Sequence, residues 1–286
     1  MKTLVLCNQK GGVGKSAVAT LLAHHLAQRG RRVLAIDLDH QGNFAQPLLR
    51  NGRAASMPVT SEALLTGPIP ALPDRPFVVV PAARALLDLE RQPERHTPFA
   101  RQFRSFLAAA DPAFDVCVID TNPNPDIRVI SALVSADFVL SPMQLNQEAL
   151  DGVNGLLNHD RVGLRKIKAV LNPKLNLIGL LPTLVEPTPF QKSNFQQVIM
   201  RFHPLMIRIG ERPGEYAAIP KRTCIAEAQA AGEVLWEMKK TAARDAWREI
   251  EPSLTRIADT VLGLAQPIAS TTMTTTPEAR HDAASG

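Results

Sequence analysis

The chain has 286 residues, enough to bury a sizeable hydrophobic core in one large domain or two small ones. Hydrophobic residues make up 45% and charged residues 21%, the balance of an ordinary globular protein. Residues 161–248 hold 15 Lys and Arg against seven Asp and Glu, whereas the rest holds 17 against 20. Such a basic segment indicates a polyanionic partner, nucleic acid or membrane surface, or simply a well-solvated face.

The cysteines and the apolar segments predict a cytoplasmic protein. Cys7, Cys117 and Cys224 show no CxxC spacing, and an odd number of unclustered cysteines fits a reducing compartment. The apolar run after Lys2 breaks at Asn8, so we expect no signal peptide. Because no apolar segment approaches membrane-spanning length, we expect a soluble protein without a membrane partner.

Short apolar runs rich in β-branched residues alternate along the chain with longer segments of helical periodicity. Such runs are typical of parallel strands that are buried on both faces. The predicted strands cover residues 3–7, 32–37, 77–81, 115–120, 138–142 and 177–185. A helical pattern that ends at Gly30 joins the first two strands. This order predicts a single α/β domain over residues 1–265, with a mostly parallel sheet and helices on both faces.

Two segments lack this alternation. Residues 50–76 are rich in Pro and Gly and predict a loop with a short helix near residues 61–65. Residues 266–286 are rich in Thr, Ala and Ser and have almost nothing to bury. This composition predicts a disordered tail.

The segment NQKGGVGKSA (8–17) joins the first strand to the first helix and has the composition of a phosphate-binding loop. Its glycines let the backbone direct successive N–H groups to one point, where the helix adds the positive end of its dipole. Lys15 would place an ammonium on the β- and γ-phosphates, and Ser16 would offer a hydroxyl to Mg²⁺. The predicted nucleotide-binding residues are Lys10, Gly11, Gly12, Val13, Gly14, Lys15, Ser16 and Ala17. An empty glycine-rich turn is the alternative, but a strand before and a helix after favour a P-loop NTPase.

The loop departs from the general Walker A pattern, because Gln9 replaces its first glycine and Lys10 precedes the glycine pair. KGGVGKS is the deviant Walker A motif, and here the chain resembles the ParA/Soj family of partition ATPases. The resemblance implies ATP and Mg²⁺ as cofactors and an ATP-dependent homodimer. In that dimer Lys15 serves the protomer's own ATP, while Lys10 reaches the nucleotide of the partner subunit, so both count as catalytic.

The segment VLAIDLDHQGN (33–43) is similar to the family's D-x-D-P-Q-x-N segment. Asp39 matches the carboxylate that lies near Mg²⁺ and the attacking water, which implies both a catalytic and a metal-binding role. Asp37 would support it. His40 stands where the family usually has Pro, and we assign it no role.

The segment FDVCVIDTNP (114–123) resembles the Walker B motif. Asp120 comes at the carboxyl end of its strand, where ligands of open α/β sheets bind, and would hold Mg²⁺ together with Ser16 and Asp39. Asn122 replaces the family's usual Ala or Pro in the segment that senses the γ-phosphate. We expect the adenine pocket near residues 182–185.

The resemblance extends over residues 2–264 and is closest to plasmid partition ATPases of the IncC type. The C-terminal part predicts one basic helix over residues 232–251, opened by Gly232 and closed by Pro252. Basic residues four apart would form a stripe that the acidic residues leave uninterrupted, although an ordinary exposed face is the alternative. The predicted DNA-binding residues are Lys221, Arg222, Lys239, Lys240, Arg244 and Arg248. Without a recognition-helix motif, their contacts should go to phosphates and depend strongly on salt.

The resemblance implies an ATP-dependent DNA partition protein on the nucleoid. ATP would close a sandwich dimer that binds DNA non-specifically, and a ParB-type centromere-binding protein would stimulate an otherwise weak hydrolysis, releasing DNA and moving a plasmid. A related positioning ATPase that moves a protein assembly is the open alternative. A Min-type membrane ATPase would need an amphipathic C-terminal anchor. A reductase like the nitrogenase iron protein would need cluster-binding cysteines, but Cys7 and Cys117 lie in predicted strands.

Overall fold

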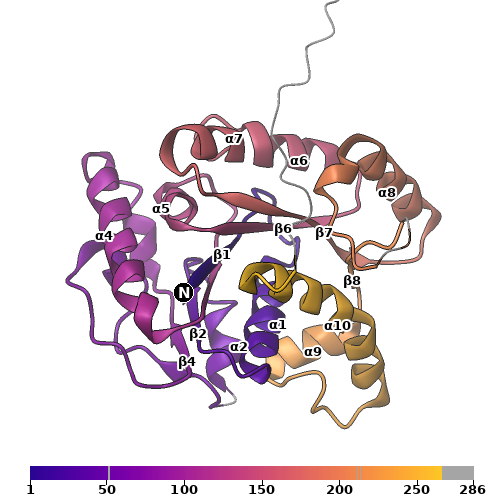
Figure 1. The fold of residues 1–286 in the computed structure, drawn as a ribbon, viewed down its shortest axis with the longest axis horizontal. Helices are drawn as coiled ribbons and strands as arrows, with labels where there is room; N and C mark the ends of the chain where they lie inside the picture. The colour runs from indigo at the N-terminus through magenta and orange to yellow at the C-terminus, as the bar shows by residue number, and fades with distance from the viewer. Residues whose placement is uncertain (51, 211, 213, 266–286) are drawn as a thin grey trace, which may run out of the picture.

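In the computed structural model, which describes residues 1–50, 52–210, 212 and 214–265, one parallel sheet of eight strands runs through the molecule (Figure 1). The strand order is β3-β4-β2-β5-β1-β6-β7-β8. The strands are β1 Lys2–Leu6, β2 Val33–Asp37, β3 Ala55–Ser56, β4 Phe77–Val80, β5 Val116–Asp120, β6 Phe138–Gln144, β7 Asn176–Val185 and β8 Ile219–Pro220. The predicted tail, residues 266–286, lies outside the described residues.

The central strands are buried on both faces, as their continuous apolar sequences predict. All residues of β2 and β5 are buried, and β1 lies between β5 and β6. All six predicted strands are confirmed, with ends that differ by no more than two residues. β3 and β8 were not predicted, because a strand of two residues is too short to show periodicity.

Helices cover both faces of the sheet, which confirms the predicted α/β fold. One layer consists of α1 Lys15–Gln28, α2 Ala45–Arg50, α9 Thr223–Ala231 and α10 Thr241–Leu262. The other consists of α3 Ala63–Thr66, α4 His96–Ala110, α5 Ile127–Ser135, α6 Ala149–Asn158, α7 Leu164–Lys166 and α8 Pro189–Phe202, with a π-helix at Ile167–Leu171. Short 3₁₀ helices occupy Arg84–Asp88, Pro93–Arg95, Asp111–Ala113 and His203–Leu205. The expected short helix near residues 61–65 is α3.

The predicted basic helix over residues 232–251 is wrong. Gly232 ends α9 in a left-handed conformation (φ +72°), and turns lead from there to α10. Pro252 does not end α10 but lies inside it. Buried apolar residues such as Ile250 and Leu254 continue on both sides of the proline, and their packing stabilises a helix that proline alone would interrupt.

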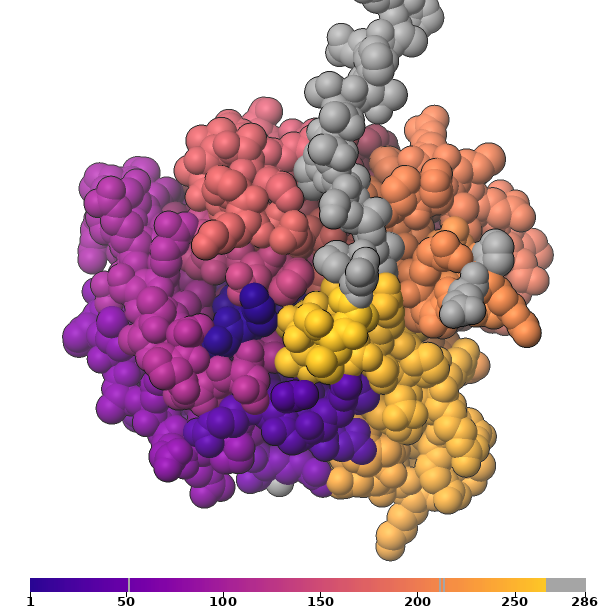
Figure 2. All heavy atoms as spheres, in the orientation of Figure 1, coloured from indigo at the N-terminus to yellow at the C-terminus, as the bar shows by residue number. Residues whose placement is uncertain are grey.

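The last helix packs against the first, so the two ends of the described chain lie side by side (Figure 2). The ring of His25 on α1 lies 5.5 Å from that of Trp247 on α10. Arg29, which directly follows α1, forms an ion pair with Asp259 on α10 at 2.6 Å. This contact connects the helix that follows the glycine-rich loop to the C-terminal region.

Candidate nucleotide-binding site

The loop between β1 and α1 forms an open cradle at the carboxyl edge of the sheet. Gly12 and Gly14 have φ angles of +72° and +80°, a conformation that favours glycine. Gly14 caps α1 without a side-chain hydrogen bond, so the helix directs unpaired N–H groups at the cradle. The Lys15 ammonium donates to the carbonyls of Asn8 (3.0 Å) and Lys10 (3.1 Å) and so spans the loop. Burial lowers the pKa of Lys15, against the opposing effect of the Asp120 charge.

Ser16 and Asp120 meet beneath this cradle. The Ser16 hydroxyl donates to Asp120 Oδ2 at 2.6 Å, and Asp120 Oδ1 is buried with no hydrogen-bond partner among the described residues. Burial, and then the charge of Asp37, raises the pKa of Asp120 well above its usual range. An orphaned carboxylate oxygen beside a hydroxyl fits a hard cation such as Mg²⁺, whose remaining ligands would be phosphate oxygens and water.

Asp37 organises the loop that carries Asp39. Its carboxylate accepts backbone N–H groups from Asp39 (3.0 Å), Phe44 (3.1 Å) and Ala45 (2.9 Å). Burial raises its pKa to about 7, although these hydrogen bonds act in the opposite direction. Asp39 itself is 8% exposed and accepts the backbone N–H of Gln41 at 3.1 Å. Asp37 therefore holds Asp39 in place, as the sequence analysis expected for a supporting residue.

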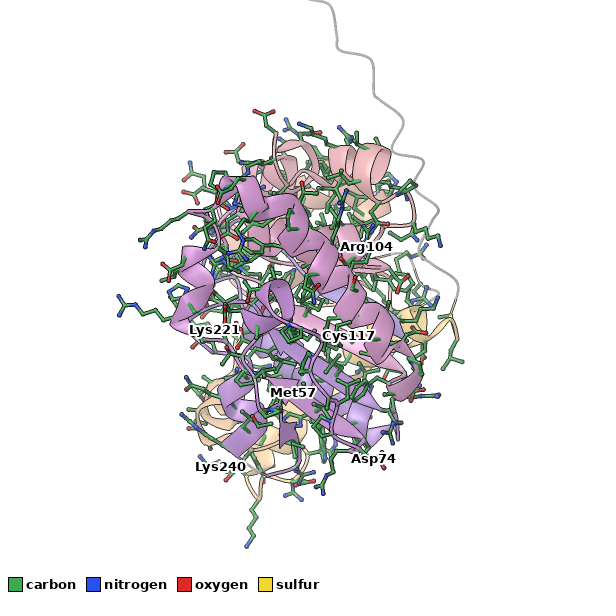
Figure 3. All side chains as sticks on the ribbon, turned by 90° about the vertical axis from the view of Figure 1, so that its left-hand side faces the viewer. Met57, Asp74, Arg104, Cys117, Lys221 and Lys240 are labelled. Carbon is green, nitrogen blue, oxygen red and sulfur yellow. The ribbon has the colours of Figure 1, made fainter. Side chains whose placement is uncertain are left out.

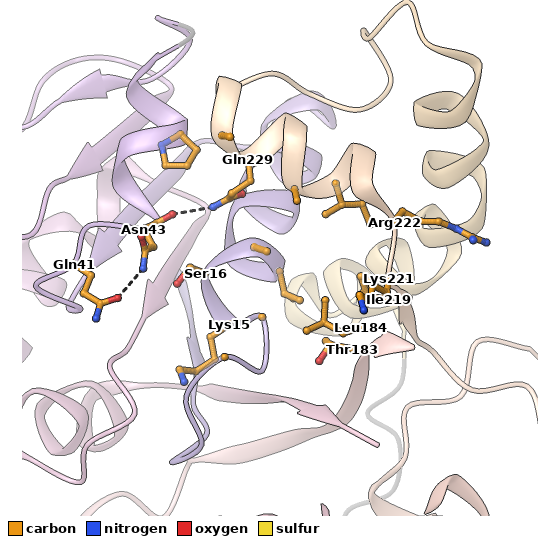
Figure 4. A pocket seen from close by; sticks show the side chains of 18 of the residues that line it. Lys15, Ser16, Gln41, Asn43, Thr183, Leu184, Ile219, Lys221, Arg222 and Gln229 are labelled. Atoms are coloured by element: carbon orange, nitrogen blue, oxygen red, sulfur yellow. Dashed lines mark hydrogen bonds between the residues drawn. The ribbon is translucent and has the colours of Figure 1, made fainter. Parts of the chain in front are cut away.

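A cavity of about 830 Å³ extends from the cradle toward α9 (Figure 4). Asp39 and the glycine-rich loop form one end. Thr183 and Leu184, from the region expected to hold adenine, line its side. Residues 219–222 and the start of α9 close the far end. These far-end residues were not predicted as cavity walls, because the two-residue strand β8 is too short to show periodicity and no motif marks the segment.

Lys10 does not line this cavity. Its ammonium forms an ion pair with Glu148, which immediately precedes α6. This bond is the main cause that lowers the pKa of Glu148. The ammonium groups of the two lysines therefore lie on different sides of the loop. That of Lys15 lies within the cradle, whereas that of Lys10 lies outside it.

Acidic partners interrupt the basic stripe expected from Lys240, Arg244 and Arg248, so the expectation of an uninterrupted stripe is wrong. The six predicted DNA-binding residues differ in their partners. Four form exposed ion pairs: Lys221 with Glu186 (3.3 Å), Arg222 with Glu249 (2.8 Å), Lys240 with Glu227 (2.8 Å) and Arg248 with Asp245 (3.0 Å). Lys239 and Arg244 are exposed and have no ion pair among the described residues. Lys239 and Lys240 precede α10, and Lys221 and Arg222 also line the nucleotide cavity.

Comparison with known proteins decides the family. A family model described as an AAA domain matches residues 1–177. Protein IncC from Escherichia coli is 33% identical over 264 residues, 87% of this chain and 67% of IncC. The chromosome-partitioning ATPase Soj from Thermus thermophilus is 32% identical over 251 residues, 85% of this chain and 90% of Soj. The chain belongs to the ParA/Soj family of partition ATPases.

Solved structures share the fold of this chain. Cobyrinic acid a,c-diamide synthase from Mycobacterium smegmatis with bound ADP and magnesium is 26% identical, with a TM-score of 0.64, over 84% of this chain and 97% of the synthase. The ATP complex of a McdA variant from Cyanothece shares the fold, with 20% identity and a TM-score of 0.71 over 93% and 98% of the two chains. As a partition ATPase the chain has the expected P-loop fold. Within its described part, each helix is too short or too polar to cross a membrane.

Proposed function

We propose that this partition ATPase moves plasmid DNA by an ATP-controlled cycle of dimerisation and DNA binding. ATP and Mg²⁺ would close a sandwich dimer that binds DNA non-specifically. Hydrolysis, stimulated by a ParB-type centromere-binding protein, would then release the DNA. The observation that carries the proposal is the division between Lys15, which spans the cradle, and Lys10, which lies outside it. The plasmid as cargo rests on the likeness to IncC.

The residues at the cradle would divide the work of hydrolysis. The N–H groups of the loop and the Lys15 ammonium would bind the phosphates, and Ser16 and Asp120 would hold Mg²⁺. The metal would supply charge neutralisation on the phosphates. Asp39, held by Asp37, would orient the attacking water.

Lys10 would complete the site of the partner subunit. Its ammonium needs only to exchange Glu148 for a phosphate of the second protomer's ATP. The exposed ion pair is weak, so the exchange requires little free energy. ADP lacks the γ-phosphate charge, and the closed dimer would then open.

The C-terminal cations would bind DNA through its phosphates. Phosphate oxygens would replace the carboxylates of Glu227 and Glu249 on Lys240 and Arg222, and Lys239 and Arg244 would add unpaired charge. A symmetric dimer doubles these contacts, so dimerisation would raise DNA affinity steeply. Because the contacts are electrostatic, affinity should fall with salt.

Sedimentation and gel shifts with non-specific duplex DNA, in ATP, in ADP and without nucleotide, test the proposal. The wild type should dimerise and shift DNA only in ATP. Lys10→Ala should lose both activities, and Arg244→Ala/Arg248→Ala should lose DNA binding alone. Arg75→Ala, at an exposed arginine without an ion pair in the described structure, is the control and should behave as wild type. DNA binding that ignores the nucleotide, or binding to liposomes in its place, would contradict the proposal.

A further inference from the structure

A second basic surface lies on the helical layer opposite to α9 and α10, where the sequence analysis placed no function. Arg101 and Arg104 on α4 line one cavity with Leu171 of the π-helix, and Lys168 and Lys174 lie three residues before and after Leu171 in the chain. We call these four cations the α4/π surface. None of these four cations forms an ion pair within the described residues. Lys168 donates only to the amide oxygen of Asn176, at 3.1 Å. Figure 3 turns the α4 side toward the viewer and labels Arg104. These charges lack the internal carboxylates that neutralise most of the C-terminal cations.

Two aliphatic side chains are exposed within this surface. Val170 is 69% exposed and Leu171 is 49% exposed, both in the π-helix. The turn that carries them is fixed, because the Asn172 amide donates to the carbonyls of Leu133 (2.9 Å) and Ala136 (2.8 Å) at the end of α5. π-Helical turns occur frequently at functional sites. The exposure of Leu171 is therefore a property of an anchored turn.

Leu171 also forms one wall of a cavity of about 320 Å³ between α4 and α5. The α5 side of the cavity is apolar and consists of Ile127, Ile130 and Val134. Arg101 belongs to its α4 side and is exposed. An apolar concavity with cations at its edge has room for an aliphatic or aromatic side chain whose neighbours are acidic.

We propose that the α4/π surface binds an acidic segment of a partner protein. The segment would insert one apolar side chain between Leu171 and α5, and its Asp or Glu residues would pair with Arg101 and Lys168. The observations favour protein over DNA or a lipid bilayer. A duplex offers no apolar side chain to the cavity, and a flat bilayer would leave the concavity unfilled.

A segment bound there would contact the element that follows the nucleotide site. Ile127 lines the cavity, and its backbone N–H donates to Glu90 at 2.9 Å. The preceding Asp126 accepts the side-chain amide of Asn122 at 3.0 Å, two residues after Asp120. The occupant of the cavity would therefore contact the start of α5, which is hydrogen-bonded to the residues that follow β5.

Selection of a random 12-residue peptide library on the immobilised full chain tests the proposal. Selected peptides should be rich in Asp and Glu and carry a large apolar residue, and fluorescence polarisation then measures their affinity. Arg101→Glu should weaken binding at least tenfold, and Leu171→Ser at least threefold. Arg75→Glu, with the same charge change elsewhere, should leave it unchanged. Circular dichroism checks that each variant is folded.

Three results would overturn the proposal. The first is a selection without acidic peptides, and the second is binding that Arg101→Glu and Leu171→Ser leave unchanged. The third comes from parallel assays with a 40-base-pair duplex and with phosphatidylglycerol vesicles. If these two variants abolish binding to either probe, the surface belongs to nucleic acid or membrane.

Discussion

Lys10 and Lys15 lie five residues apart in one loop, yet their ammonium groups have different partners. Lys15 bonds to carbonyls of its own loop, whereas Lys10 bonds to the carboxylate of Glu148. Under the proposed function, Lys10 must leave this carboxylate before it can reach a second protomer. Glu148 therefore competes with the dimer for the same cation.

Replacement of Glu148 tests this competition. Glu148→Gln should lower the ATP concentration at half-maximal dimerisation by about two- to fivefold, the range that an exposed ion pair allows. Analytical ultracentrifugation across an ATP titration measures the change. Glu227→Gln, which removes an exposed carboxylate of the C-terminal region, is the control and should leave the midpoint unchanged. A higher midpoint in Glu148→Gln would show that the carboxylate supports the dimer instead.

At the scale of elements, the features that could be predicted are those marked by a short local sequence pattern. The cradle was predictable because KGGVGKS lies between a strand and a helix, and Asp120 because an apolar run ends there. The C-terminal region was not, since glycine can precede a helix or end one and proline is usually excluded from a helix interior. Gly232 ends α9, and packing carries α10 through Pro252. Both outcomes depend on tertiary contacts that no local pattern contains.

The ends of α9 and α10 offer a matched pair of glycines, Gly232 and Gly263. Gly232 and Gly263 both have φ near +72°, but only at Gly232 would a Cβ meet other atoms, Arg50 Cβ at 2.6 Å and Pro47 O at 2.8 Å. Gly263→Ala should lower the free energy of unfolding by about 1 kcal/mol, the cost of a left-handed conformation. Gly232→Ala should lower it by about 2–4 kcal/mol, because overpacking adds to that cost. Urea denaturation measures both, and equal losses would disprove the close contact between α9 and α2.

At the scale of the whole molecule, two buried histidines of α1 pack against two distant elements, β4 and α10. His24 packs edge-on against Phe77 of β4, and His25 lies against Trp247 of α10. Burial, helped by nearby arginines, lowers the pKa of each to about 4 from an ordinary value of 6.5. The unfolded chain therefore binds these protons first as the pH falls. Their contribution to stability is complete above pH 6.5 and is lost as the pH falls toward 4.

The contribution of each histidine to the free energy of unfolding should accordingly decrease by up to roughly 3 kcal/mol between pH 6.5 and 4, whereas the raised pKa values of Asp37 and Asp120 act in the opposite direction over the same range. In this chain the Thr255 hydroxyl lies 3.2 Å from the His25 imidazole. His25→Gln removes the titrating group and keeps a hydrogen-bond partner for that hydroxyl. Urea denaturation at each pH should show that the difference in free energy of unfolding between variant and wild type shifts in favour of the variant as the pH falls from 6.5 to 4. The exposed His203→Gln should follow the wild type. A slope that His25→Gln does not change would mean that His25 is not buried in neutral form.

The position of β1 has a consequence for the newly made chain. β1 pairs with β5 from Val116 onward and with β6 from Phe138 onward, although it is the first strand to be synthesised. At about 5–20 residues per second, a ribosome needs roughly 7 to 27 seconds to pass from β1 to the end of the paired part of β6. During this interval the apolar strand lacks β6 throughout and lacks β5 for most of the time, so the sheet edge that carries the phosphate-binding loop is incomplete. The nascent chain can therefore gain stability from nucleotide only after about half of it has been made.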